Sequence, residues 1–258
     1  MNIPFYKFYG AGNDFVVVDN RERGWSPTVD QVAHLCHRRF GVGADGLMTL
    51  DPAPNGFDFE MHYYNSDGRL GSMCGNGGRC IAAFAHLLGI GSHLRFAAYD
   101  GPHTADILTW DGHIGLVRLG MRDLPASAIE RVLDGWFLDT GSPHYVQRVE
   151  GLDTYDVVQC GRQLRNMADV FPQGTNVDFI EDLPDGRLAI RTYERGVEDE
   201  TWACGTGVTA AALVSGNHRL VARGGDFRVD FEATGDAFTN VTLTGPVALN
   251  FTGEAPIQ

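Results

Sequence analysis

The chain has 258 residues, 43% of them hydrophobic and 21% charged, so it can bury a sizeable core in one large domain or two ordinary ones. Its formal charge of -13 argues against a nucleic-acid partner, because such proteins usually carry a basic stripe that neutralises phosphates. Five cysteines at irregular spacing indicate free thiols, and no CxxC pair or His-rich tract suggests a metal site. We therefore expect a globular protein without a nucleic-acid or metal partner.

The N-terminal stretch has no cationic flank followed by an apolar run and a small-residue cleavage site, so no secretory signal is expected. The longest apolar stretch, 80–90, contains His86 and is too short to cross a bilayer. We therefore expect a cytoplasmic protein without a membrane partner.

Runs of β-branched and aromatic residues between glycines predict a strand-rich first half. A helix is expected over about 28–39, where apolar residues recur at helical spacing and Gly41 follows as a stop. A second helix is expected to start at the glycines of 74–77 and to end at Gly89. The predicted strands are 5–9, 15–19, 47–50, 57–64 and a meander over 94–119.

The second half repeats this order of features. Its predicted helices are 163–170 and 206–214, and its predicted strands are 137–147, 155–158, 187–194, 220–223, 227–231, 241–243 and 247–251. The turn at 174–180 resembles the one at 12–16, since in each an Asn leads into a strand. The halves are interpreted as a diverged duplication: an N-terminal lobe 1–120, a C-terminal lobe 121–246, and a segment 247–258 that returns to the N-terminal lobe.

The strongest sign of duplication is the motif Cys-Gly-x-Gly, at 74–77 and again at 204–207, each time before an Ala-containing apolar segment. A cysteine at a helix start faces unpaired N–H groups and the positive end of the helix dipole, which favours the thiolate. The adjacent glycines let backbone amides approach an anion such as a carboxylate. The alternative is that both are buried structural cysteines at tight turns.

Two equivalent thiols suggest a particular reaction. If the halves face each other across a cleft, one thiol removes a proton from one face of a carbon and the other returns a proton to the opposite face. A proton next to a carboxylate is weakly acidic, so preorganised donors must hold the developing charge. The pattern therefore predicts stereoinversion by two bases.

The segments 10–15, 73–80, 142–144, 174–176 and 193–207 together resemble the diaminopimelate epimerase family over nearly the whole chain. The resemblance implies an α+β fold of two pseudo-symmetric lobes, each a curved mixed β-sheet wrapped around a central helix. It also implies cofactor-independent interconversion of LL- and meso-diaminopimelate, a small-molecule amino-acid substrate, for lysine and peptidoglycan synthesis. A homodimer is an expectation that the sequence does not decide.

Carried over onto matching positions, Cys74 and Cys204 resemble the acid/base thiols, while His144 and Glu194 resemble residues that tune the pKa values of these thiols. The positions that match substrate-binding residues are Asn13, Asn65, Gly75, Asn76, Asn176, Glu194, Arg195, Gly205 and Thr206. The chain departs from the family pattern at Gly46, where some members have a substrate-contacting Gln, and at Ser142, where many have Asn. The segment from Arg195 to the second cysteine is also one residue longer than usual.

Structural roles for these residues stay open. The three asparagines 13, 65 and 176 could be turn formers that bond to local backbone. His144 could be a satisfied core histidine. Glu194 and Arg195 are adjacent on a predicted strand, so their side chains point to opposite faces unless the strand has ended.

Two other functions compete with this interpretation. Proline-type racemases and hydroxyproline epimerases share the fold but typically carry His where this chain has Asn76. A non-catalytic amino-acid-binding protein is the alternative from another class, although loss of function would be expected to remove a motif cysteine first.

Overall fold

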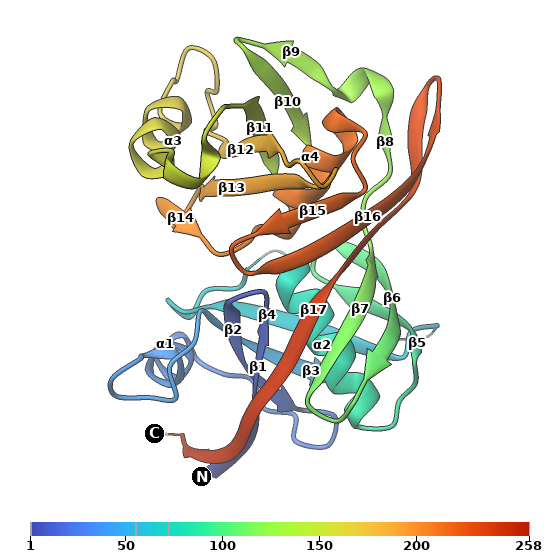
Figure 1. Cartoon of the computed structure of the whole chain (residues 1–258). Coiled ribbons are helices and arrows are strands. Elements are labelled where there is room, and N and C mark those ends of the chain that lie inside the picture. Colours follow the sequence, from blue (N-terminus) through green and yellow to red (C-terminus); the bar gives the residue numbers. More distant parts are fainter. Residues whose placement is uncertain (1, 55, 72, 258) are drawn as a thin grey trace. The chain divides into compact units, whose positions relative to one another are not determined.

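The computed structural model describes residues 2–54, 56–71 and 73–257, and the chain divides into two compact units (Figure 1). Unit 1 comprises Met1–Leu119 and Gly245–Gln258, and unit 2 comprises Gly120–Thr244. The boundary at 244–245 falls inside one strand, β17 (Ala237–Pro256), which therefore contributes residues to both units.

Unit 1 is a mixed sheet with two helices within its described residues. Its elements are β1 (Asn2–Gly10), β2 (Asn13–Asp19), α1 (Val29–Cys36), β3 (Gly46–Asp51), β4 (Phe59–Asn65), α2 (Gly75–Leu87), β5 (His93–Ala98), β6 (Gly101–Trp110) and β7 (Ile114–Gly120). Successive strand pairs are antiparallel, parallel, antiparallel, parallel, antiparallel and antiparallel. β17 pairs antiparallel with both β1 and β7.

Unit 2 follows the same plan. Its elements are β8 (Leu124–Pro125), β9 (Glu130–Val132), β10 (Gly135–Asp139), β11 (Pro143–Arg148), α3 (Val157–Arg165), β12 (Asn176–Asp182), β13 (Leu188–Glu194), β14 (Asp199–Thr201), α4 (Gly205–Ser215), β15 (Arg219–Ala222) and β16 (Gly225–Thr234), with short 3₁₀ turns at Ala126–Ala128 and Leu152–Thr154. From β10 through β11, β12, β13, β15 and β16 to β17, the pairs are again antiparallel, parallel, antiparallel, parallel, antiparallel and antiparallel. The predicted α+β fold of two pseudo-symmetric halves is confirmed.

The pairing also corrects how the two halves align. In unit 1 β2 runs parallel to β3 with Phe15 opposite Gly46, and in unit 2 β11 runs parallel to β12 with His144 opposite Asn176. The turn before β12 therefore corresponds to the turn before β3. The proposed equivalence of 174–180 with 12–16 is wrong, because the segment equivalent to β2 is β11.

Two local predictions in unit 2 are also wrong. The run 155–158 was expected to be a strand and 163–170 a helix, but α3 begins at Val157, where the Asp156 side chain caps it by accepting from the Gln159 N–H at 3.0 Å. A short apolar run does not distinguish a strand from a buried helix turn. The predicted strand 137–147 is interrupted by residues 140–142, and the strands predicted at 241–243 and 247–251 are parts of the continuous β17.

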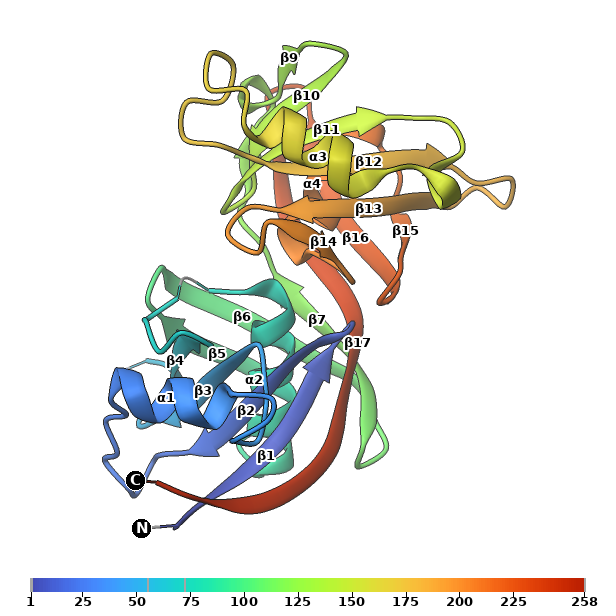
Figure 2. The ribbon, with the colours of Figure 1, turned by 90° about the vertical axis from the view of Figure 1, so that its left-hand side faces the viewer.

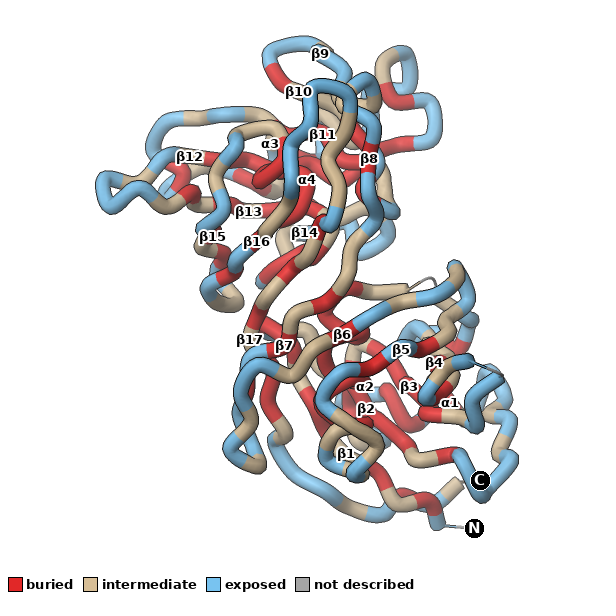
Figure 3. Tube along the Cα trace, turned by 90° about the vertical axis from the view of Figure 1, so that its right-hand side faces the viewer, coloured by how far each residue is buried: buried red, intermediate tan, exposed pale blue. Residues whose placement is uncertain are grey.

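The central helix of each unit lies inside its sheet. α2 contacts β1, β2, β3 and β6, and α4 contacts β10 to β13, β15 and β16. In Figures 1 and 2 the strands of unit 1 curve around α2 and those of unit 2 around α4. Figure 3 shows both helices buried over most of their length. A helix that is apolar on all sides, as α4 is, is stable only when it is enclosed in this way.

The outer helices cover the other face of each sheet. α1 packs Val32, Leu35 and Cys36 against apolar residues of β1, β2 and β3, and its start is fixed by a capping box between Thr28 and Gln31. α3 packs on β12 and β13 in a second cluster. No helix in the described part of the chain is both long enough and apolar enough to span a bilayer.

Candidate active site

The two motif cysteines occupy the same structural position. Each is the N-cap of its unit's central helix, with φ and ψ of -105° and 125° at Cys74 and -111° and 115° at Cys204. The carbonyl of Cys74 accepts from the Gly78 N–H at 2.7 Å, and that of Cys204 from the Val208 N–H at 2.9 Å. Each thiol therefore lies beside the backbone N–H groups of the first helical turn, as the motif predicted.

In unit 1, the half-buried thiol of Cys74 contacts an amide whose orientation is fixed. Its Sγ lies 3.5 Å from Asn13 Oδ1, and the nitrogen of the same amide donates to Asp45 Oδ2 at 2.6 Å. A carboxylate oxygen can only accept, so Nδ2 must face Asp45 and the oxygen must face the thiol. Asp45 thereby determines which group Asn13 presents to the site.

Asp45 belongs to a charged network. Arg38 forms ion pairs of 2.7 Å with both Asp14 and Asp45, and Lys7 pairs with Asp14 at 2.6 Å. Burial opposes ionisation of Asp14, but hydrogen bonds from Arg38 and Lys7, and their charges, lower its pKa to about 2. Asp14 and Asp45 thus link the Asn13 amide to two cations.

A buried arginine supports the first turn of α2. The side chain of Arg79 is completely buried, and its two terminal nitrogens donate to the Gly75 carbonyl at 3.0 Å and to Asn76 Oδ1 at 2.8 Å. Burial lowers its pKa to about 10, so the guanidinium remains charged at neutral pH. Sequence reasoning missed Arg79, although an arginine inside an otherwise apolar helix was the available signal.

In unit 2, a chain of hydrogen bonds leads from the second thiol into the core. Cys204 Sγ lies 3.3 Å from the Thr206 hydroxyl, which lies 2.8 Å from His144 Nε2. His144 Nδ1 lies 2.7 Å from Asp178 Oδ2, and both of these side chains are fully buried. Asp178 Oδ1 accepts from the Thr192 hydroxyl at 2.7 Å. Sequence reasoning identified His144 but not Asp178.

The electrostatics at Cys204 differ from the expectation for a helix start. Burial raises the pKa of this thiol well above its ordinary value, and the negative charges of Glu194 and Asp178 raise it further. The hydrogen bonds from Thr206 and from the Gly207 backbone lower it by less. The isolated thiol is therefore protonated at neutral pH, because the loss of hydration outweighs the favourable helix start.

The space around the last glycine of each motif explains why a larger residue does not fit there. A Cβ at Gly207 would lie 2.4 Å from Asp178 Oδ1 and 3.2 Å from His144 Cε1, so any side chain there would displace this pair. A Cβ at Gly77 would meet the flexible side chain of Met48 at 3.1 Å. The glycine is thus required more strictly in unit 2.

Asn176 connects two segments of unit 2 by hydrogen bonds. Its Nδ2 donates to Ser142 Oγ at 2.8 Å and to the Pro143 carbonyl at 2.9 Å, while its Oδ1 accepts from the Arg195 N–H at 2.8 Å. β13 ends at Glu194, so the opposite-face argument for a continuous strand does not extend to Arg195. The Arg195 guanidinium donates to the Gln173 carbonyl at 3.2 Å.

Tyr63 occupies the space that a side chain at Gly46 would need. A Cβ there would lie 2.5 Å from Tyr63 Cε2 and 2.6 Å from the Tyr64 carbonyl oxygen. A glutamine at this position would therefore need Tyr63 to move. Gly46 pairs across the sheet with Asn65, which is exposed at the end of β4.

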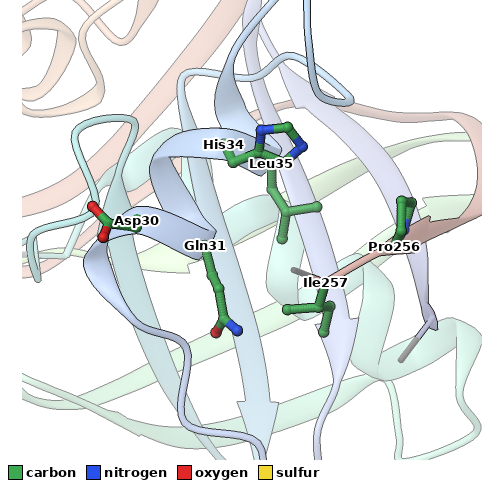
Figure 4. Close-up of a pocket in the computed structure, with 6 residues that line it drawn as sticks. All are labelled: Asp30, Gln31, His34, Leu35, Pro256 and Ile257. Carbon is green, nitrogen blue, oxygen red and sulfur yellow. The ribbon is translucent and has the colours of Figure 1, made fainter.

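Within the residues that the structure describes, no group of three or more His, Cys, Asp or Glu side chains could hold a metal ion. A cavity of about 200 Å³ lies between α1 and residues 256–257, at the end of β17, where Figure 4 shows Asp30, Gln31, His34, Leu35, Pro256 and Ile257. None of the predicted site residues is among its described lining. This cavity is separate from the chemistry at the helix starts.

Comparison with solved structures defines the class of the fold. The chain aligns over its whole length with a hydroxyproline epimerase from Agrobacterium vitis, at a TM-score of 0.72, 16% identity and 93% coverage of that chain. It aligns over 99% of its length with a probable proline racemase from Agrobacterium radiobacter, at a TM-score of 0.71, 16% identity and 93% coverage of that chain. Identity this low supports the fold alone, which the chain shares with both of these proteins.

Sequence comparison gives the family. Residues 5–117 and 136–254 match diaminopimelate epimerase. The diaminopimelate epimerase of Chlorobaculum tepidum is 49% identical over 214 residues, which cover 80% of each chain. That of Flavobacterium psychrophilum is 42% identical over 261 residues, covering 96% of this chain and 98% of the relative. The chain belongs to the diaminopimelate epimerase family and is an isomerase, which confirms the resemblance found in its motifs.

Proposed function

We propose that the chain interconverts LL- and meso-diaminopimelate without a cofactor, with Cys74 and Cys204 as the two acid/base groups. The observation that carries this proposal is the equivalence of the two thiols, since each is the N-cap of its unit's central helix with nearly the same backbone angles. A duplicated thiol at a duplicated helix start suits a reaction that needs the same chemistry on two faces of one carbon. The family relationship supplies the substrate.

The roles divide between thiols and donors. One thiolate removes the α-hydrogen while the other thiol donates a proton to the opposite face, and the roles exchange in the reverse reaction. The backbone N–H groups of Gly75, Asn76, Gly205 and Thr206 hold the carboxylate at the reacting carbon, where negative charge develops. The proposed contacts to the remaining ammonium and carboxylate groups come from Asn13, Asn65, Asn176, Glu194 and Arg195.

Two of these assignments have independent chemical support. A guanidinium such as that of Arg195 matches a carboxylate in bidentate geometry. Asn13 presents an amide oxygen toward Cys74, and an oxygen acceptor suits a substrate ammonium group. The proposed tuning of Cys204 by His144 and Glu194 agrees with the hydrogen bond through Thr206 and with the influence of Glu194 on that thiol.

We also propose the cytoplasm as the setting and a homodimer as the assembly, with neither nucleic acid nor membrane as a partner. All five cysteines are free, which suits a reducing compartment. Sedimentation of the purified chain checks the dimer, and a mass that stays monomeric across a concentration series contradicts it.

The test is hydrogen exchange in D₂O with purified protein and no added cofactor. Diaminopimelate is expected to take up deuterium at its α-carbon while the LL and meso forms equilibrate. Proline and hydroxyproline serve as competing substrates in parallel assays. Exchange on proline but not on diaminopimelate, or turnover only after pyridoxal phosphate or a divalent metal is added, would overturn the proposal.

Alanine variants of the two thiols complete the test. Cys74→Ala and Cys204→Ala should each abolish epimerisation, because each removes one of two required bases. Cys160→Ala, which changes a half-buried cysteine outside both motifs, is the matched control and should retain activity. Full activity in either motif variant refutes the two-base scheme.

A further inference from the structure

We propose that Thr206, His144 and Asp178 form a relay that takes up the proton of Cys204, with the Thr206 hydroxyl as its essential link and Asp178 as a positioning residue. The inference deepens the proposed function, since it concerns how one of the two proposed bases is prepared. Neither Asp178 nor the side chain of Thr206 was assigned this role from the sequence.

The geometry leaves one continuous path. Sulfur and hydroxyl are 3.3 Å apart, hydroxyl and His144 Nε2 are 2.8 Å apart, and His144 Nδ1 and Asp178 Oδ2 are 2.7 Å apart. His144 is hydrogen-bonded to Thr206 and not to Cys204. A proton that moves between the thiol and the imidazole therefore passes through the Thr206 hydroxyl. All three hydrogen bonds lie within unit 2.

The neighbours of His144 select its tautomer. The Asp178 carboxylate accepts, so Nδ1 carries the proton and donates to it. Both N–H groups of the Asn176 amide donate elsewhere, to Ser142 Oγ and to the Pro143 carbonyl. In a neutral imidazole whose proton is on Nδ1, the other nitrogen, Nε2, is an unprotonated acceptor. His144 therefore holds a free lone pair on the ring nitrogen that faces Thr206.

Each proton transfer in the proposed relay breaks one bond to hydrogen and forms another. The Cys204 thiol gives its proton to Thr206 Oγ1 as the proton of that hydroxyl passes to His144 Nε2. The S–H and O–H bonds break, a new O–H and a new N–H bond form, and the hydroxyl is regenerated. The products are a thiolate and an imidazolium whose Nδ1–H still donates to Asp178. The same steps in reverse return a proton to Cys204 when it acts as the acid.

The relay lowers the cost of forming a thiolate at the buried Cys204. Cys204 is 8% exposed, and the charges of Glu194 and Asp178 disfavour a lone thiolate beside them. Moving the proton only as far as His144 creates a cation between the thiolate and Asp178, so no net charge is added to the buried site. In unit 1 the helix position equivalent to Thr206 holds Asn76, which has no hydroxyl and whose amide oxygen accepts from Arg79. The relay is thus specific to Cys204.

The experiment measures the reactivity of Cys204 in the substrate-free full-length protein. The rate of alkylation by iodoacetamide is followed by peptide mass spectrometry, with Cys74 in the same sample as an internal reference, and ultraviolet thiolate absorbance is recorded alongside. Thr206→Val, which removes the hydroxyl and keeps the backbone N–H, should lower the Cys204 rate about tenfold or more. Thr206→Ser should restore it. Thr209→Val is the control, because that buried hydroxyl donates to the Gly205 carbonyl.

Asp178→Asn separates the relay from simple electrostatics by the sign of its effect. If Asp178 acts on Cys204 only through its charge, removing that charge makes the thiolate easier to form and raises the alkylation rate. If Asp178 orients His144 and stabilises the imidazolium, the rate falls. A raised rate in Asp178→Asn, or an unchanged rate in Thr206→Val, overturns the proposal.

The two proposals fail separately. A chain that does not exchange diaminopimelate but whose Cys204 reactivity depends on Thr206 contradicts the proposed function alone. An active epimerase whose Cys204 reactivity ignores Thr206 and Asp178 contradicts the relay alone. Circular dichroism and thermal unfolding of each variant identify a loss of fold, and the sign of the effect of Asp178→Asn retains the test if Thr206→Val does not fold.

Discussion

Asp45 and Asn13 are joined by a 2.6 Å hydrogen bond that turns the amide oxygen of Asn13 toward Cys74. Asp45 → Asn replaces an obligate acceptor by a group that can donate or accept, so the Asn13 amide can rotate. Hydrogen bonds to charged groups contribute about 1.5 to 3 kcal/mol, so kcat/KM for diaminopimelate should fall about tenfold or more. Steady-state kinetics of the variant measure this effect.

Asp67→Asn is the matched control for that variant. Asp67 is an exposed turn residue whose carboxylate accepts from the Arg69 backbone N–H. Its substitution should leave kcat/KM near that of the parent. Equal kinetics for Asp45→Asn and Asp67→Asn would show that the orientation of the Asn13 amide does not matter for turnover.

Substituting the last glycine of each motif should have unequal effects. Gly207→Ala places a methyl group against Asp178 and His144, at distances that real side chains do not tolerate. Gly77→Ala meets mainly the end of the Met48 side chain, which can move. Over-packing costs about 1 to 3 kcal/mol where neighbours are rigid. We expect Gly207→Ala to lose both thermal stability and turnover and Gly77→Ala to lose less of each, and the reverse order would contradict the packing argument.

The pair of His62 and Asp51 should make stability depend on pH. The hydrogen bond that His62 donates to Asp51 raises the pKa of His62 above its ordinary 6.5, and the charges of Asp51 and Glu60 add to this. A raised folded-state pKa gives stability that is fully present below the unfolded-state pKa and is lost as the pH rises through the folded-state pKa. His62→Gln should therefore lower the unfolding temperature more at about pH 5.5 than at about pH 8.5.

His93→Gln provides the comparison for that measurement. His93 also faces an aspartate, Asp106, but its side chain is 89% exposed, so solvent screens the pair. We expect this substitution to change the unfolding temperature little. A His62→Gln variant that changes it as little at both pH values would show that the Asp51 pair does not contribute to folding.

Two cysteines outside the motifs should be chemically inert in the folded protein. Burial raises the pKa of Cys36 to about 12 and raises that of Cys80 further, so neither forms appreciable thiolate at neutral pH. Iodoacetamide at neutral pH should leave both unmodified in the native protein and modify both in urea, as peptide mass spectrometry can measure. Rapid native labelling of either would indicate that its unit opens locally.

The sequence predicted the features that arise from local order. The two thiols were placed at helix starts because Cys-Gly-x-Gly precedes an apolar run that ends at a glycine, and capping is decided within a few residues. Asp178 was not found, because its role depends on β11 and β12 lying side by side and on Gly207 leaving room beneath them. The pKa of Cys204 was expected to fall, but burial is a tertiary property and reverses the local effect.

The errors have related causes. The strand predicted at 155–158 is the start of α3, where the Asp156 cap decides a short ambiguous run. The halves were recognised as a duplication from the repeated Cys-Gly-x-Gly motif, but the pairing of 174–180 with 12–16 failed because similar turns precede different strands in the two units. Arg79 was overlooked because its complete burial depends on the sheet that encloses α2, although its partners Gly75 and Asn76 lie on its own helix.

The strand β17 has a consequence for biosynthesis. Its residues after 244 pair with β1 and β7 of unit 1, although every other strand of that unit precedes position 121. On the ribosome, the early-made unit must therefore wait with its β1 edge unpaired until all of unit 2 has been translated, and an unpaired edge invites aggregation. Truncation of the chain before β17 should therefore prevent unit 1, which is synthesised first, from completing its sheet. Chaperones should accordingly bind mainly to unit 1 during synthesis.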